Sequence, residues 1–98
     1  MSNMLQIVIN EEGHVILSGR FDASQVEKAK EVFDRVNTST TVDFRNLDYI
    51  SSAGLGVLLF TQKRLKESGD GLKLISMNNH IKDVFRYAGF NMIFEIVD

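Results

Sequence analysis

Stretches rich in β-branched residues alternate with stretches of helical periodicity through most of this 98-residue chain. We expect a first strand over 4–9, a tight turn over 10–13 and a returning strand over 14–18. After this hairpin each strand reaches the next through a helix, and such crossovers make parallel neighbours that are nearly always right-handed. The order strand, strand, helix, strand, helix, strand, helix, strand therefore predicts an α/β fold with a mixed sheet of about five strands.

Local signals set the remaining boundaries. Residues 19–22 are expected to form a loop, and Ser24 is expected to open the first helix because Glu27 follows at the spacing of a capping box. Further strands are expected over 41–44, 72–77 and 92–97, and helices over about 53–67 and from Asn78 or Asn79 to a stop at Gly89. Each helix should bury one apolar stripe, made of Val26, Ala29, Phe33 and Val36, then Leu55, Leu58, Leu59, Leu65 and Gln62, then Ile81, Val84, Phe85 and Ala88.

Composition excludes several classes of function. The chain has no cysteine, which excludes disulfides, Cys-based zinc sites and thiol catalysis and suits the cytoplasm. Eleven basic residues against thirteen acidic ones leave no basic stripe for nucleic acid. No apolar run approaches the ~20 residues of a membrane span, and residues 1–4 do not resemble a signal peptide. We expect a single domain over 1–98, located in the cytoplasm, without metal, cofactor, membrane or nucleic acid.

The stretch Tyr-Ile-Ser-Ser-Ala-Gly-Leu-Gly over 49–56 carries the most functional information. It joins a central strand to the second helix, and partners meet loops at the carboxyl ends of parallel strands. Ser51 or Ser52 can cap the helix, while Ala53, Gly54 and Gly56 are small enough to let another backbone or a phosphate come close. A phosphate on the cap serine would add about −1.5 to −2 charges beside backbone donors, so it should change the surface without melting the helix.

Simpler interpretations stand beside this one. Two serines before a helix are most often caps and nothing more. Val57, Phe60 and Arg64 lie off the main stripe, where they can meet a partner or pack on neighbouring helices. Asp22 can be a turn residue, although a right-handed crossover should bring its loop to the same edge as Ser52. A small serine hydrolase is a distant alternative, since the sequence lacks a nucleophile elbow and a plausible triad.

The element order, the loop Gly19-Arg20-Phe21-Asp22 and the run Ile50-Ser51-Ser52-Ala53-Gly54-Leu55-Gly56 resemble the STAS domains of bacterial anti-sigma factor antagonists. The resemblance covers nearly the whole chain. It implies a mixed sheet with helices mainly on one face, a phosphorylatable serine at Ser52 and a nearby loop aspartate at Asp22. The sequence departs from the family pattern at Ser51, where many members carry Asp.

The resemblance also implies a cycle in which this chain is substrate and switch, not an enzyme. The unphosphorylated form would bind a serine kinase of the histidine-kinase-like ATPase type that doubles as anti-sigma factor, and a PP2C-type phosphatase would reverse the modification. The expected partner surface comprises Asp22, Ser51, Ser52, Ala53, Gly54, Gly56 and Val57. The alternative, left open by Ser51, is a STAS subunit of a transport or signalling assembly that is not phosphorylated.

Overall fold

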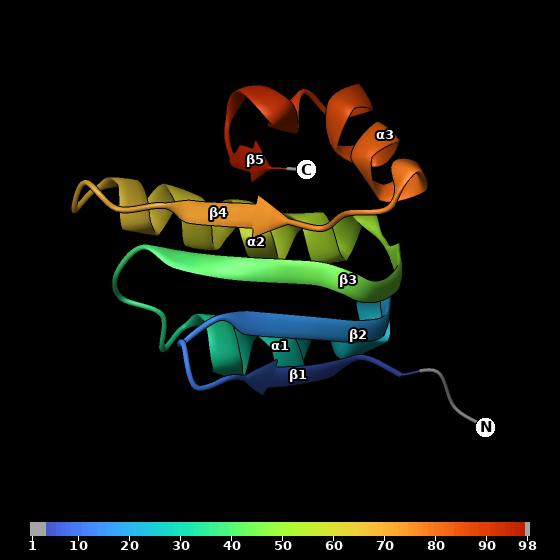
Figure 1. Ribbon diagram of the computed structural model, residues 1–98, viewed down its shortest axis with the longest axis horizontal. Helices are drawn as coiled ribbons and strands as arrows, with labels where there is room; N and C mark the ends of the chain where they lie inside the picture. The colour runs from blue at the N-terminus through green and yellow to red at the C-terminus, as the bar shows by residue number, and fades with distance from the viewer. Residues whose placement is uncertain (1–3, 98) are drawn as a thin grey trace.

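The computed structural model describes residues 4–97, which form a mixed five-stranded sheet with three α-helices, as predicted. The strands lie in the order of the chain, with the first antiparallel to the second and all other neighbours parallel (Figure 1). The elements are β1 (Gln6–Ile9), β2 (Val15–Phe21), the 3-10 turn η1 (Ala23–Gln25), α1 (Val26–Phe33), β3 (Thr40–Ile50), α2 (Ser52–Lys66), β4 (Leu72–Ile75), α3 (Asn79–Tyr87), the 3-10 turn η2 (Phe90–Met92) and β5 (Glu95–Val97).

The β1–β2 hairpin has the predicted tight turn. Gly13 takes a φ of 81°, a left-handed conformation that glycine adopts without steric cost. The Asn10 N–H donates to the His14 carbonyl at 3.0 Å, and the Asn10 side-chain oxygen accepts from the N–H groups of Glu12 and His14. Asparagine at the start and glycine at the end of the turn therefore fix the register of the first strand pair.

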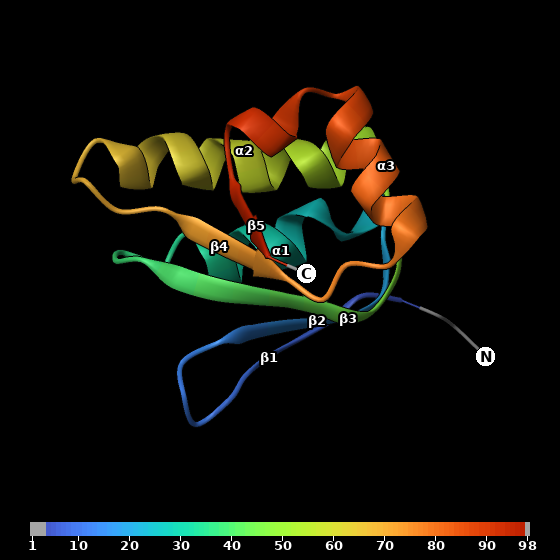
Figure 2. The same ribbon diagram turned by 45° about the horizontal axis from the view of Figure 1, so that its top comes forward.

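All three helices lie on the same side of the sheet (Figure 2), in agreement with the expected one-sided cover. The buried residues of β2 alternate strictly, so that Val15, Leu17 and Phe21 face the helices. α3 is held to this core by an aromatic cluster, in which Phe85 meets Phe44 edge-on at a centroid distance of 5.8 Å. The sheet and its helices thus share one apolar core, which fixes α1 and α2 relative to the strand ends.

Two boundaries near the site were predicted wrongly. The expected loop over 19–22 is mostly strand, because β2 continues to Phe21 through Gly19, whose φ of 85° marks an irregularity rather than an end. The expected strand over 41–44 continues to Ile50. Its pairing with β2 shifts twice, so that β3 carries extra residues and Arg45 and Asn46 are both exposed. Those bulges break the alternation that a sequence pattern detects.

The first helix begins differently from the prediction. Ser24 does not cap α1 through a capping box, because the chain first makes the turn η1, which is capped by Asp22. Gln25 precedes α1 without a side-chain hydrogen bond to its backbone. The last strand is shorter than expected, because residues 90–92 form η2, and Ala88 is exposed instead of buried.

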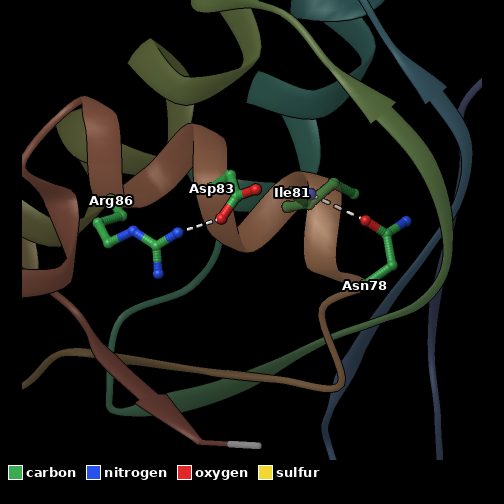
Figure 3. A network of polar contacts seen from close by, with 4 residues as sticks. All are labelled: Asn78, Ile81, Asp83 and Arg86. Atoms are coloured by element: carbon green, nitrogen blue, oxygen red, sulfur yellow. Dashed lines mark hydrogen bonds and ion pairs between the residues drawn. The ribbon is translucent and has the colours of Figure 1, made fainter.

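The cap of α3 agrees with one of the two predicted residues. Figure 3 shows the Asn78 side-chain oxygen accepting from the Ile81 N–H at 2.8 Å, which satisfies one of the free donors of the first turn. Asp83 and Arg86 form an ion pair one turn apart along the same helix. Gly89, with a φ of 76°, ends the segment at the predicted position.

Candidate functional site

The carboxyl ends of β2 and β3 bring two loops together. Phe21 pairs with Ile50 in the parallel ladder, and the Ser51 N–H continues that ladder by donating to the Phe21 carbonyl at 2.9 Å. Asp22 follows Phe21, and α2 begins directly after Ser51, at the right-hand edge of the sheet in Figure 1. The predicted placement of Asp22 at the same sheet edge as Ser52 is therefore confirmed.

The two adjacent serines have different structural roles. Ser51 is the N-cap of α2: its backbone is extended, and its hydroxyl accepts from the Gly54 N–H at 3.2 Å. Ser52 is the first helical residue and is exposed, and its hydroxyl makes no hydrogen bond within residues 4–97. The first-turn N–H groups at this end of α2 have no carbonyl in the helix to pair with, so negative charge is favoured there.

Asp22 is engaged within its own loop. Its carboxylate oxygen accepts from the Ser24 N–H at 3.1 Å and from the Ser24 hydroxyl at 2.6 Å. That hydroxyl in turn accepts from the Gln25 side-chain amide at 3.1 Å. The sequence reasoning assigned Ser24 to helix capping and missed this network. The signal that could have found it is the Asp-x-Ser spacing, which is typical of an Asx turn.

The two glycines of α2 differ in their surroundings. Gly54 is buried, and a Cβ placed there would lie 2.9 Å from Ile50 Cγ1 and 3.0 Å from the Phe21 ring. Gly54 therefore allows α2 to lie close to the ends of β2 and β3. The expectation that Gly54 leaves room for a partner is wrong, because the sheet already occupies that space. Gly56 is exposed, and a Cβ there would meet nothing within 4 Å. Gly56 thus leaves open space on the outer surface.

The side chains off the main stripe of α2 divide into packed and open ones. Val57 is only 7% exposed and belongs to the core, so its assignment to an accessible partner surface is corrected in favour of packing. Arg64 donates two hydrogen bonds of 2.9 Å to the carbonyls of Phe33 and Val36, which ties α2 to the end of α1. Phe60 is 61% exposed and is the open member of this set.

A groove runs between α1 and α2 from the neighbourhood of Ser52. Its volume is about 280 Å³, and most of its lining is apolar. The sequence reasoning did not single out the α1 side of this groove, because Lys30 and Asp34 look like ordinary solvated charges without the packing of the two helices. The residues of this α1–α2 groove are Val26, Lys30, Asp34, Ala53, Gly56, Val57, Phe60 and Thr61.

The described residues hold neither a metal-binding cluster nor a membrane-spanning helix. Over residues 4–97, no three His, Asp or Glu side chains lie close enough together to hold a metal ion. Within the same residues, no helix has the length and apolar character needed to cross a membrane. The candidate site is the surface at the start of α2, where Ser51, Ser52, Ala53 and Gly56 lie.

Comparison with known proteins identifies the family. A family model described as Mlab, STAS domain matches residues 8–97. The chain belongs to the STAS family of anti-sigma factor antagonists. It is 34% identical over 84 residues to BtrV of Bordetella bronchiseptica, a candidate anti-sigma factor antagonist; the match covers 86% of this chain and 72% of BtrV.

Solved structures share the STAS fold. An anti-sigma factor antagonist candidate from Thermotoga maritima matches with a TM-score of 0.77 and 24% identity, over 96% of this chain and 86% of its own. SpoIIAA in its unphosphorylated form matches with a TM-score of 0.71 and 18% identity, over 97% and 88% of the two chains. The phosphorylated form of SpoIIAA from Bacillus matches with a TM-score of 0.69 and the same identity, over 97% and 92%.

Proposed function

We propose that this STAS domain is an anti-sigma factor antagonist that switches partners through phosphorylation of Ser52. The unphosphorylated form binds a serine kinase of the histidine-kinase-like ATPase type, which is also the anti-sigma factor, in the cytoplasm. Phosphorylation releases this chain from the kinase, and a PP2C-type phosphatase restores the binding form. The chain is the substrate and switch of this cycle and not its catalyst.

The observation that carries the proposal is the division of roles between the two serines. Ser51 holds the start of α2 through its hydroxyl, whereas Ser52 presents an exposed hydroxyl one residue later. A modification of Ser52 therefore leaves the cap hydrogen bond of Ser51 in place. The names of the relatives support the same proposal, since BtrV is a candidate anti-sigma factor antagonist and SpoIIAA exists in phosphorylated and unphosphorylated forms.

The proposed transfer is a simple displacement at phosphorus. The Ser52 hydroxyl oxygen attacks the γ-phosphorus of ATP, and a base of the kinase takes the hydroxyl proton. The bond between the γ-phosphorus and the β–γ bridging oxygen breaks, and ADP leaves. The phosphatase reverses the state with water, which yields serine and inorganic phosphate. The new group adds about −1.5 to −2 charges at the start of α2. Because the helix dipole favours negative charge there, the domain stays folded while its surface repels a partner that fits the neutral form.

The test uses the purified chain, the kinase and ATP, followed by intact-mass analysis. We expect one added phosphoryl group on the wild type and on Ser51→Ala, and none on Ser52→Ala. An unmodified wild type, or equal modification of wild type and Ser52→Ala, would reject the switch site. If the wild type stays unmodified and copurifies with transport subunits, the function is that of a subunit that is not phosphorylated.

A second measurement addresses the release step. Calorimetry should show that Ser52→Asp binds the kinase about tenfold more weakly than the wild type, because the added charge faces a surface suited to the neutral form. Ser52→Asn is the matched control, since it has a similar size without the charge. Equal affinities of the wild type and Ser52→Asp would contradict release by charge.

A further inference from the structure

The α1–α2 groove described above combines an open glycine with an exposed aromatic side chain. Gly56 leaves empty space on the surface of α2, and Phe60 lies one turn further along with 61% of its surface exposed. Ala53 contributes a second small residue on the same flank, one turn before Gly56. Together these residues leave a depression beside Phe60 that a side chain from outside can enter.

The inner wall of the groove is mostly apolar. Val57 is buried, and the Thr61 hydroxyl is committed to the Val57 carbonyl at 2.9 Å. Small-molecule sites typically occupy about 300–1,000 Å³ and place several polar groups around the ligand. At about 280 Å³ and with an apolar lining, the groove suits a few apolar side chains of a protein partner better than a free ligand.

The rim of the groove carries two side chains of opposite charge. Lys30 and Asp34 lie four residues apart on α1, so their side chains are one helical turn apart. Within residues 4–97 neither side chain takes part in an ion pair. Both are exposed, and they present opposite charges along the direction of α1. A partner helix that carries an acidic and a basic residue one turn apart can face both charges at once.

We infer that the α1–α2 groove receives an amphipathic helix of the kinase partner, which inserts an apolar side chain beside Gly56 and Phe60. An acidic residue of that helix faces Lys30, and a basic residue one turn away faces Asp34. This inference rests on the proposed function, since the groove begins beside Ser52. The groove contacts contribute the same binding energy before and during phosphoryl transfer, whereas Ser52 supplies the oxygen that reacts.

The variants follow from the geometry. Gly56→Leu places a side chain in the depression, where its Cβ meets no atom within 4 Å, and Phe60→Ala removes the exposed wall. Tyr87→Ala is the matched control, because Tyr87 is an aromatic residue on α3 that is 83% exposed and lies outside the groove. Exchanging the charges with Lys30→Asp and Asp34→Lys keeps the net charge and reverses the rim pattern. Circular dichroism verifies that each variant is folded.

Calorimetry with the kinase should show an affinity about tenfold or more below wild type for Gly56→Leu, Phe60→Ala and the charge exchange. Tyr87→Ala should stay within about twofold of the wild type. In phosphorylation kinetics, Gly56→Leu should raise KM for this chain and leave kcat unchanged, because the groove contributes uniform binding.

The outcomes separate the two proposals. A kinase that discriminates Ser52→Asp from the wild type but binds Gly56→Leu and Phe60→Ala normally would overturn the groove inference and leave the proposed function intact. A kinase that does not bind or modify the wild type overturns the proposed function and the inference with it. A wild-type dimer that Gly56→Leu converts to a monomer in light scattering would assign the groove to a second copy and also overturn the inference.

Discussion

Gly54→Ala and Gly56→Ala should change the stability of the domain in opposite directions, although the residues are two positions apart in α2. Alanine is favoured over glycine in a helix by up to about 1 kcal/mol. Neither glycine has a positive φ, so alanine can adopt the backbone conformation at both positions without strain. At Gly56 nothing opposes this gain, because an added Cβ meets no atom within 4 Å. We expect Gly56→Ala to raise the free energy of unfolding by about 0.5–1 kcal/mol.

At Gly54 the same methyl group meets the core. It would lie 2.9 Å from Ile50 Cγ1 and 3.0 Å from two atoms of the Phe21 ring, and Phe21 is fully buried and cannot move away freely. Overpacking of this kind costs about 1–3 kcal/mol, which exceeds the helical gain. We expect Gly54→Ala to lower the free energy of unfolding by about 1–2 kcal/mol.

Urea denaturation followed by circular dichroism measures both variants against the wild type. The difference of about 2 kcal/mol between them corresponds to about 10 °C in Tm for a domain of this size. The m-value should stay constant, because neither change alters the surface exposed on unfolding. A Gly54→Ala variant as stable as Gly56→Ala would refute the reasoning, since the contact of Gly54 with Phe21 and Ile50 would then not limit the packing.

Two further predictions concern buried and capping hydrogen bonds. Ser51→Ala should lower the free energy of unfolding by about 1 kcal/mol, because the hydrogen bond that caps α2 is lost. Ser52→Ala should change the free energy of unfolding by less than about 0.5 kcal/mol in the same urea titration. Equal losses for the two variants would show that both serines cap the helix. Gln62→Leu should lower the free energy of unfolding by about 2–4 kcal/mol, because the side chain of Gln62 accepts from the Leu72 N–H at 2.7 Å and donates to the Ile93 carbonyl at 2.8 Å. The Leu72 N–H should also exchange its hydrogen faster in this variant, and unchanged protection of Leu72 would contradict the prediction.

The order of elements could be predicted from the sequence because apolar periodicity reports which side of each element is buried. The length of β3 could not, because its bulges place Arg45 and Asn46 in succession at the surface and end the alternation early. Gly19 led to the wrong prediction that the second strand ends before residue 19. A glycine with positive φ ends many strands, but here it lies inside β2, and only pairing with β3 distinguishes the two cases.

The candidate site was predicted in its location but not in its internal division. Position in the sequence places Ser51 and Ser52 equally well for capping, and the choice depends on the backbone turning helical at Ser52. The opposite environments of Gly54 and Gly56 depend on how α2 is rotated over Phe21 and Ile50. The α1–α2 groove depends on the packing of two helices that are far apart in the chain, so no local pattern carries it.

The backbone before Ser52 is fastened on two sides, by the Ser51 N–H to β2 and by the Ser51 hydroxyl to the first turn of α2. The proposed phosphoryl group on Ser52 would therefore be attached to a backbone that is held in place on both sides. We expect the two forms to differ mainly in the charge at the start of α2, with little change in the position of the backbone. A partner that responds to the proposed modification would then have to contact the carboxyl ends of β2 and β3 directly.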